Sequence, residues 1–276
     1  MKNGKNFLLT ALADKVVISA IALTLILAIC MLAGAYILPT HDNSAPPSGD
    51  DFTIPADDAG MVVQANIDSM TLTVTRPDSA DLVPYTERGF DEPLEASVAW
   101  WMNQGFMANT SEYRWFLRTT PDVRDSYYEP AQVFFDFVTD SLDDAENASA
   151  LHDDMVLYRG MSGNYVYTMI NNSAYSDNAY SSTSYDPTVC LNVTFGARTS
   201  DGYQNVLVMK KEKGEHALYI NEEAREVLIP RESRFTVTKI VNVGNLTVRA
   251  DFPLIWSTNM TATFEKVRLI YLAENN

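Results

Sequence analysis

A run of 23 uncharged residues, from Val16 to Leu38, is the feature that most restricts how this chain folds. At about 1.5 Å per residue, a helix of this length spans the hydrocarbon core of a bilayer, which is about 30 Å thick. The run is long and ends at Pro39, which predicts an uncleaved signal anchor. We therefore expect a tail over residues 1–15, a membrane span over residues 16–38, and a separate folded part downstream.

The charges around this run predict its orientation. Lys2, Lys5 and Lys15 precede it, and an excess of positive charge marks the cytoplasmic side of a membrane span. We expect the amino terminus in the cytoplasm, the rest outside the cell, and contact with the lipid bilayer through residues 16–38. A cleaved leader and a pilin-like apolar helix are the alternatives. Six N-x-S/T sequons, which can be glycosylated only outside the cytosol, follow the span. They begin at Asn109, Asn147, Asn171, Asn192, Asn245 and Asn259.

Composition removes several classes of function. The chain has 276 residues and a net charge of −16, and its acidic excess lies after the apolar run. Such a surface repels phosphate backbones, so we expect no nucleic acid partner; solubility is its ordinary use. Cys30 lies in the apolar run and leaves Cys190 without a disulfide partner. The three histidines show no metal-ligand spacing, so we expect neither a metal site nor a histidine-based triad.

The remaining chain changes its pattern near Met155. Proline, glycine, serine and aspartate dominate from Pro39 to about Gly60, which predicts a linker over residues 39–80 and a domain over residues 81–276. Short runs of branched and aromatic residues follow Met155, whereas helical periodicity precedes it, so we expect an α+β fold. Helices are expected over 92–106, 110–118, 129–145 and 186–198. Strands are expected over 70–77, 155–159, 179–184, 205–210, 226–230, 234–241 and 266–273.

Three polar motifs end or open these strands. In LYRG, Arg159 ends a strand and Gly160 follows; arginine grips phosphate oxygens in a bidentate manner, and glycine lets a ligand approach the backbone. YSSTSYD, at 180–186, is a hydroxyl cluster that can orient a neighbouring side chain or hold a ribose. Glu226 opens the strand EVLIP. Taken singly, each has an ordinary interpretation: an arginine paired with an acidic neighbour, a polar strand end, and a carboxylate beside a strand.

In this order the motifs resemble the ADP-ribosyltransferase fold family, specifically its toxin-type exoenzyme branch with an Arg, Ser-Thr-Ser, Glu signature. The resemblance covers about Tyr85 to Ala273 and is strongest from Met155 to Phe235. The connecting text is similar too, because VLVMKKEKGEHALYI looks like the family's strand, basic turn and next strand. The resemblance implies an ADP-ribosyltransferase-like fold with a helical amino-terminal part and a strand-rich catalytic core of two packed sheets.

The resemblance also implies an activity and roles for individual residues. The domain would cleave the nicotinamide–ribose bond of NAD, without a metal, and transfer ADP-ribose to an unknown protein acceptor. Glu226 would stabilise the oxocarbenium-like ribose as the bond breaks, because a carboxylate opposes the developing positive charge. Ser182 would position Glu226, and Arg159 would hold the NAD phosphates. The other expected NAD-binding residues are Tyr158, Gly160, Thr183 and Ser184.

The sequence departs from the family in the expected acceptor loop, which contains Asn221, Glu222, Glu223 and Ala224. Arginine-modifying members carry an acidic residue two positions before the catalytic glutamate, where Ala224 stands here. The family's aromatic substrate-reading residue is absent at its usual place, which Asn221 occupies. The leading hypothesis is a membrane-anchored mono-ADP-ribosyltransferase. An NAD glycohydrolase, with water as acceptor, and an inactive surface binding or adhesion module are the alternatives.

Overall fold

A computed structural model describes most of the chain from residue 63 onward. The described residues are 63–104, 108–125, 127, 129–161, 165–192, 198–255 and 259–275. The predicted cytoplasmic tail and membrane span therefore lie outside the described residues. Among the residues that the structure does describe, no helix is both long and apolar enough to cross a membrane.

Helices come first after one long strand, as the periodicity predicts. They are the 3-10 turn η1 (Tyr85–Glu87), α2 (Glu92–Gln104), α3 (Ala108–Arg118), α4 (Pro121–Arg124) and α5 (Glu129–Asn147). In α5 the buried apolar positions are Phe135, Val138, Leu142 and Ala145, spaced by three and four residues as on one helix face. Phe137, which the sequence places beside the core stripe, is 47% exposed.

Nine strands form one mixed sheet. They are β1 (Val63–Val74), β2 (Met155–Met161), β3 (Ala174–Ser176), β4 (Ser181–Ser184), β5 (Gln204–Lys211), β6 (Leu218–Asn221), β7 (Glu226–Ile229), β8 (Arg234–Ala250) and β9 (Thr261–Glu274). The order is β1-β8-β9-β5-β2-β4-β7-β6, and β3 pairs with β8. Two short helices, α6 (Tyr165–Asn171) and α7 (Pro187–Asn192), separate the first strands after α5. The fold class is therefore α+β.

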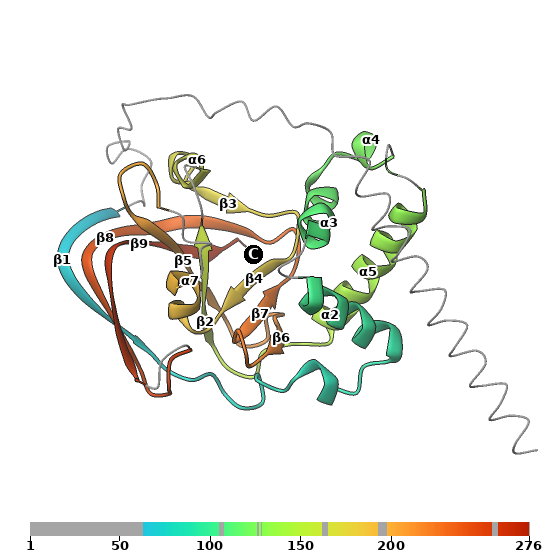
Figure 1. Cartoon of the computed structure of the whole chain (residues 1–276), viewed down its shortest axis with the longest axis horizontal. Coiled ribbons are helices and arrows are strands. Elements are labelled where there is room, and N and C mark those ends of the chain that lie inside the picture. The colour runs from blue at the N-terminus through green and yellow to red at the C-terminus, as the bar shows by residue number, and fades with distance from the viewer. Residues whose placement is uncertain are drawn as a thin grey trace, which may run out of the picture. The chain divides into compact units, whose positions relative to one another are not determined.

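The prediction of two separate packed sheets needs correction. All nine strands belong to one hydrogen-bonded sheet. Its two halves meet at a single residue pair, where Tyr158 of β2 lies opposite Ser184 of β4. Figure 1 shows the long strands β1, β8 and β9 curving on one side of this junction, and β4, β7 and β6 lying toward the helices on the other. A sequence pattern does not distinguish two half-sheets joined by one residue pair from two separate sheets.

The sheet also begins earlier in the chain than the expected domain. β1 lies inside the predicted linker 39–80, and it pairs in parallel with β8 from Val63 to Val74. Gly244 of β8 allows this approach, because a Cβ atom there would lie 2.7 Å from the backbone oxygen of Asp68. Ordinary Cβ contacts are longer, so a side chain at this position would push the two strands apart.

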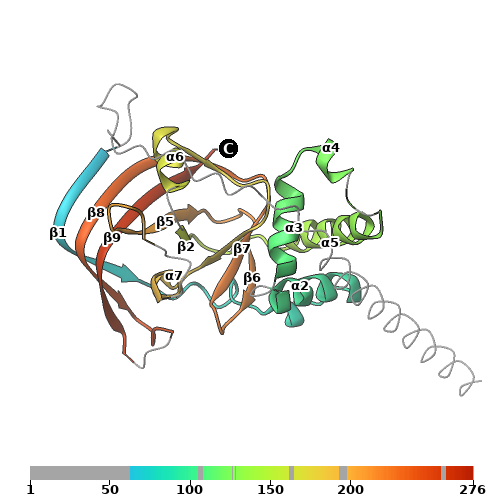
Figure 2. The same cartoon turned by 45° about the horizontal axis from the view of Figure 1, so that its top comes forward.

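Two apolar cores lie on either side of the inner strands. The larger is formed by the long strands with β2, β5, α6 and α7. The smaller lies between helices α2, α3 and α5, the strands β6 and β7, and the segment that precedes β4; Figure 2 shows the helices beside β6 and β7 from a second angle. It is rich in aromatic rings. Its buried members include Trp101, Tyr113, Phe116, Phe135, Tyr180, Leu218, Ile220 and Leu228.

Candidate active site

Strand pairing brings Ser182 and Glu226 together. β4 and β7 are antiparallel, with Ser184 opposite Glu226, so Ser182 lies two residues along on the same face. The Ser182 hydroxyl donates to Oε1 of Glu226 at 2.5 Å. This is the arrangement expected for a serine that orients a carboxylate. The neighbouring hydroxyls secure the strand ends instead: Thr183 donates to the carbonyl of Val227 at 2.5 Å, and Ser184 to that of Ala224 at 3.1 Å.

Two further donors hold the Glu226 carboxylate. The indole Nε1 of Trp101, on α2, donates to Oε1 at 3.3 Å, and Nδ2 of Asn221 approaches Oε2 at 3.5 Å. Asn221 also caps its own loop, because its Oδ1 accepts the backbone N–H of Ala224 at 2.7 Å. Trp101 was not predicted from the sequence. The sequence feature that could have pointed to it is a tryptophan on a helix that buries an apolar face, because a buried indole N–H needs an acceptor.

Arg159 pairs with an acidic residue, Asp177, as its ordinary interpretation suggests, but Asp177 also pairs with Arg118. Asp177 accepts Nε and Nη2 of Arg118 at 2.8 and 2.6 Å, whereas Nη2 of Arg159 lies at 3.4 Å. Burial alone would raise the pKa of Asp177; the Arg118 hydrogen bonds and the charge of Arg159 outweigh it, so the pKa is lowered. Asp177 is therefore ionised, and it compensates one of the two arginine charges.

A third arginine, Arg114 on α3, leaves this cluster with excess positive charge. Its guanidinium lies over the ring of Trp101, 4.8 Å from the centroid. Burial, reinforced by Arg159, lowers its pKa to about 10, so it remains charged at neutral pH. Nε of Arg114 and Nη1 of Arg159 are both buried without a hydrogen-bond partner in the described part of the chain. Unpaired guanidinium atoms of this kind are suited to an anion.

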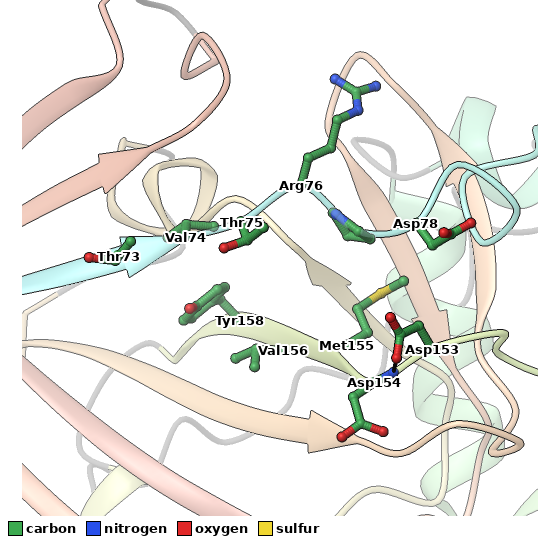
Figure 3. A pocket seen from close by; sticks show the side chains of 11 residues that line it. Thr73, Val74, Thr75, Arg76, Asp78, Asp153, Asp154, Met155, Val156 and Tyr158 are labelled. Carbon is green, nitrogen blue, oxygen red and sulfur yellow. Dashed lines mark hydrogen bonds between the residues drawn. The ribbon is translucent and has the colours of Figure 1, made fainter.

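Tyr158 and Gly160 do not join this cluster. Successive residues of a strand point to opposite faces, so their positions face away from Arg159. Figure 3 shows Tyr158 in a separate cavity of about 260 Å³, between the end of β1 and the start of β2. A Cβ atom on Gly160 would lie 3.3 Å from the carbonyl oxygen of Cys190, so glycine here allows α7 to pack closely. The contact of Tyr158 with NAD stays a prediction.

The charged loop between β6 and β7 is held in place by bonds from two of its side chains to residues around it. Glu222 accepts the hydroxyls of Tyr219 and Tyr185 at 2.7 and 3.1 Å and pairs with Arg76 at 3.3 Å. Arg225 adopts a left-handed backbone, with φ of 48°, and its buried guanidinium donates to Asp186 at 2.7 Å.

The charges before β7 therefore set the shape of the loop that presents Glu226. In the same loop, Glu223 is exposed and Ala224 is partly buried. Among the described side chains, no group of three or more histidine, cysteine, aspartate or glutamate residues is arranged to hold a metal ion.

Part of the sequence that builds this site matches a known protein family. Residues 138–251 match the family model described as ADP-ribosyltransferase exoenzyme. Over this segment the chain is similar to that family. The matched segment contains Arg159, Ser182 and Glu226, whereas Trp101 and Arg114 lie before it and enter the site only through the fold. The resemblance that the motifs indicated is thus confirmed.

No curated protein matches the sequence. Solved structures similar to this chain include Plx2a, an ADP-ribosyltransferase toxin from Paenibacillus larvae. The two share 14% sequence identity and a TM-score of 0.47, over 70% of this chain and 91% of that one. An ADP-ribosyltransferase from Clostridium botulinum has 13% identity and a TM-score of 0.46 over 69% and 90%. A protein from S. aureus, solved with NAD, has 16% identity and a TM-score of 0.46 over 74% and 99%. The family assignment rests on the family model.

Proposed function

We propose that this chain is a mono-ADP-ribosyltransferase that cleaves the nicotinamide–ribose bond of NAD and transfers ADP-ribose to a protein. The observation that carries the proposal is the Ser182–Glu226 pair near two arginines, Arg114 and Arg159, each with a buried nitrogen that has no hydrogen-bond partner in the described part of the chain. A carboxylate can stabilise a cationic ribose, and guanidinium groups can hold a diphosphate. NAD contains both parts, and the family to which the domain is matched uses NAD as its substrate.

The arginine cluster supplies the binding of the phosphates. Arg118 and Arg159 pair with one buried carboxylate, Asp177. Arg114 interacts electrostatically with both arginines and with the carboxylates of Asp177 and Glu226. Three guanidinium charges thus face two carboxylates, and the cluster is positive before any ligand binds. A diphosphate would neutralise this excess and accept the free N–H groups. Because Arg159 and Asp177 are largely shielded from water, their charges are screened less than surface charges. The arginines thus bind and orient, and they leave the chemistry to Glu226.

Bond cleavage then requires little acid assistance. Nicotinamide leaves with the electron pair of the C–N bond, and its ring loses its positive charge in the process. The positive charge moves to the ribose, where Glu226 opposes it. Ser182 and Trp101 both donate to Oε1. Within the described residues Oε2 accepts a hydrogen bond from Asn221 alone, at 3.5 Å, so it is the oxygen left for substrate. The acceptor contributes an electron pair to the ribose carbon and loses a proton to solvent or to a base.

A second candidate, NAD glycohydrolase activity, is favoured by one specific observation. The position two residues before Glu226 is Ala224, which has no proton-accepting side chain, and the Glu222 carboxylate is engaged by two tyrosines and Arg76. Only the exposed Glu223 remains as a further acid in the described loop. Water needs less recognition than a protein side chain does, so hydrolysis would tolerate this loop better than transfer.

The test follows both products of the reaction. Purified full-length protein is incubated with NAD labelled in the adenylate part, with and without a lysate of candidate acceptors, and Glu226→Gln serves as the blank. Labelled protein together with free nicotinamide supports the transferase. Free ADP-ribose in equal amount to nicotinamide, without labelled protein, identifies a glycohydrolase. If neither product exceeds the blank, the enzyme assignment is wrong, and an inactive binding or adhesion module becomes the better account.

We also propose that residues 16–38 anchor the protein, with the domain outside the cell. The uncharged run and the preceding lysines support this, as does the exposure of the sequon asparagines at 147, 171, 192, 245 and 259. Alkaline carbonate should leave the protein in the membrane fraction, external protease should remove the domain from intact cells, and a glycosidase should lower the apparent mass if the sequons are used. Release by carbonate would refute the anchor.

A further inference from the structure

We propose that Trp101 is a positioning residue for Glu226, which directs the carboxylate toward the substrate through its indole N–H. The inference rests on the proposed function and adds a residue that lies outside the segment matched to the family. The hydrogen bond from Nε1 of Trp101 to Oε1 of Glu226 measures 3.3 Å. Trp101 is 2% exposed, so its indole N–H depends on this partner rather than on water.

The surroundings of Trp101 keep the indole in one orientation. The rings of Tyr180 and Tyr113 meet it edge-on, with centroids at 5.9 and 6.4 Å. Arg114 covers one face of the ring at 4.8 Å. A cation on the ring face withdraws electron density from the indole and so makes its N–H a better donor. The indole N–H that donates to Glu226 is therefore fixed by packing. It is strengthened by the charge of Arg114, which belongs to the expected phosphate site.

Two donors of different origin then hold the same oxygen of Glu226. Ser182 reaches Oε1 from the neighbouring strand, and Trp101 reaches it from α2. With Oε1 occupied from two directions, the carboxylate cannot rotate without losing both bonds. Since Oε2 is the oxygen left for substrate, Trp101 determines where the catalytic charge lies. A tryptophan that only filled the core would have no such effect on a reacting group.

The adjacent Trp100 provides a matched control. It is the same residue type on the same helix, and its ring meets Tyr113 and Phe134 edge-on at 5.4 Å in both cases. Within the described residues it makes no hydrogen bond, to Glu226 or to any other group. Trp100→Phe and Trp101→Phe remove similar apolar surface, but only the second removes a donor to the carboxylate.

The first arm of the experiment measures steady-state nicotinamide release by the full-length chain and both variants, with melting temperatures as a check on folding. We expect Trp101→Phe to lower kcat about tenfold, the usual effect of losing one hydrogen bond to a charged group. The KM for NAD should stay within about twofold, since phenylalanine keeps an aromatic ring face for the Arg114 guanidinium. Trp100→Phe should leave kcat unchanged. Equal kcat in Trp101→Phe and wild type, or equal losses in the two variants, would overturn the proposal.

The second arm does not depend on a variant of Trp101 folding. The chain has four tryptophans, and each gives one indole N–H signal in a ¹⁵N-labelled sample. We expect the Trp101 signal to shift upfield in Glu226→Gln, where a neutral amide replaces the charged acceptor, while the other three stay in place. An unmoved Trp101 signal refutes the hydrogen bond. A wild-type chain that releases no nicotinamide refutes the proposed function instead, so the two failures are distinguishable.

Discussion

Removing the Ser182 hydroxyl tests the best-defined contact of the site. The bond from Ser182 to Oε1 of Glu226 is 2.5 Å long, and its acceptor is a charged carboxylate. Such bonds contribute about 1.5–3 kcal/mol. If that contribution is realised in the transition state, Ser182→Ala lowers kcat by about 10-fold to about 150-fold, at about 1.4 kcal/mol per factor of ten. Trp101, at 3.3 Å, then remains as the only donor to Oε1 within the described residues.

The assay is nicotinamide release at saturating NAD, with Ser181→Ala as the matched control. Ser181 neighbours Ser182 on β4 but points to the opposite face, where its hydroxyl lies 3.4 Å from that of Tyr175. Its removal should leave kcat unchanged. The reasoning is refuted if Ser182→Ala stays within about twofold of wild type, or if Ser181→Ala loses as much activity, since either result separates the rate from the Ser182–Glu226 bond.

Three further changes probe other parts of the structure. Gly244→Ala should lower the free energy of unfolding by about 1–3 kcal/mol in urea, because the new methyl group meets the backbone of Asp68 at 2.7 Å; an unaltered midpoint would mean that β1 is not held against β8. Burial raises the pKa of Glu146 well above its ordinary value of 4.5, so its contribution to stability is lost as pH rises, and the melting temperature of Glu146→Gln should gain on wild type as the pH rises above 4.5; parallel profiles would contradict this. Arg114→Met should raise the calorimetric Kd for NAD by about tenfold, and an unchanged Kd would remove Arg114 from the phosphate site.

Much of the fold follows from patterns that the sequence displays locally. The periodic apolar stripe of α5 and the short branched strands after Met155 are visible without tertiary information, because each is a repeat along one element. The length of β8, by contrast, is not visible in the local pattern. It begins at Arg234, as predicted, but continues to Ala250, since it pairs with β9 and with β1 over most of that length. Pairing partners far apart in sequence decide where such a strand ends.

The same distinction applies to the site. Arg159, Ser182 and Glu226 stand in ordered motifs, and the sheet brings Ser182 and Glu226 into contact as the motifs indicated. Trp101 and Arg114 stand in helices whose pattern indicates only a packed face. They reach the site because α2 and α3 share an apolar core with β6 and β7, which no local spacing could indicate.

The loop before Glu226 illustrates a third limit. The sequence predicts an acceptor loop that includes its acidic residues, and the structure shows one of them, Glu222, bonded to Tyr185, Tyr219 and Arg76. Those partners come from three separate segments of the chain. A charge in a sequence shows that a carboxylate is present and does not show whether a partner elsewhere already holds it.

The central claim is that Glu226 acts on the ribose of NAD after the arginines have bound its phosphates. The most direct test compares wild type with Glu226→Gln in nicotinamide release and, on the same samples, in NAD affinity by calorimetry. We predict a loss of release of about 100-fold or more, with a Kd that changes by less than about threefold. Undiminished release from Glu226→Gln would contradict the account, because the carboxylate at the centre of the site would then have no part in the chemistry.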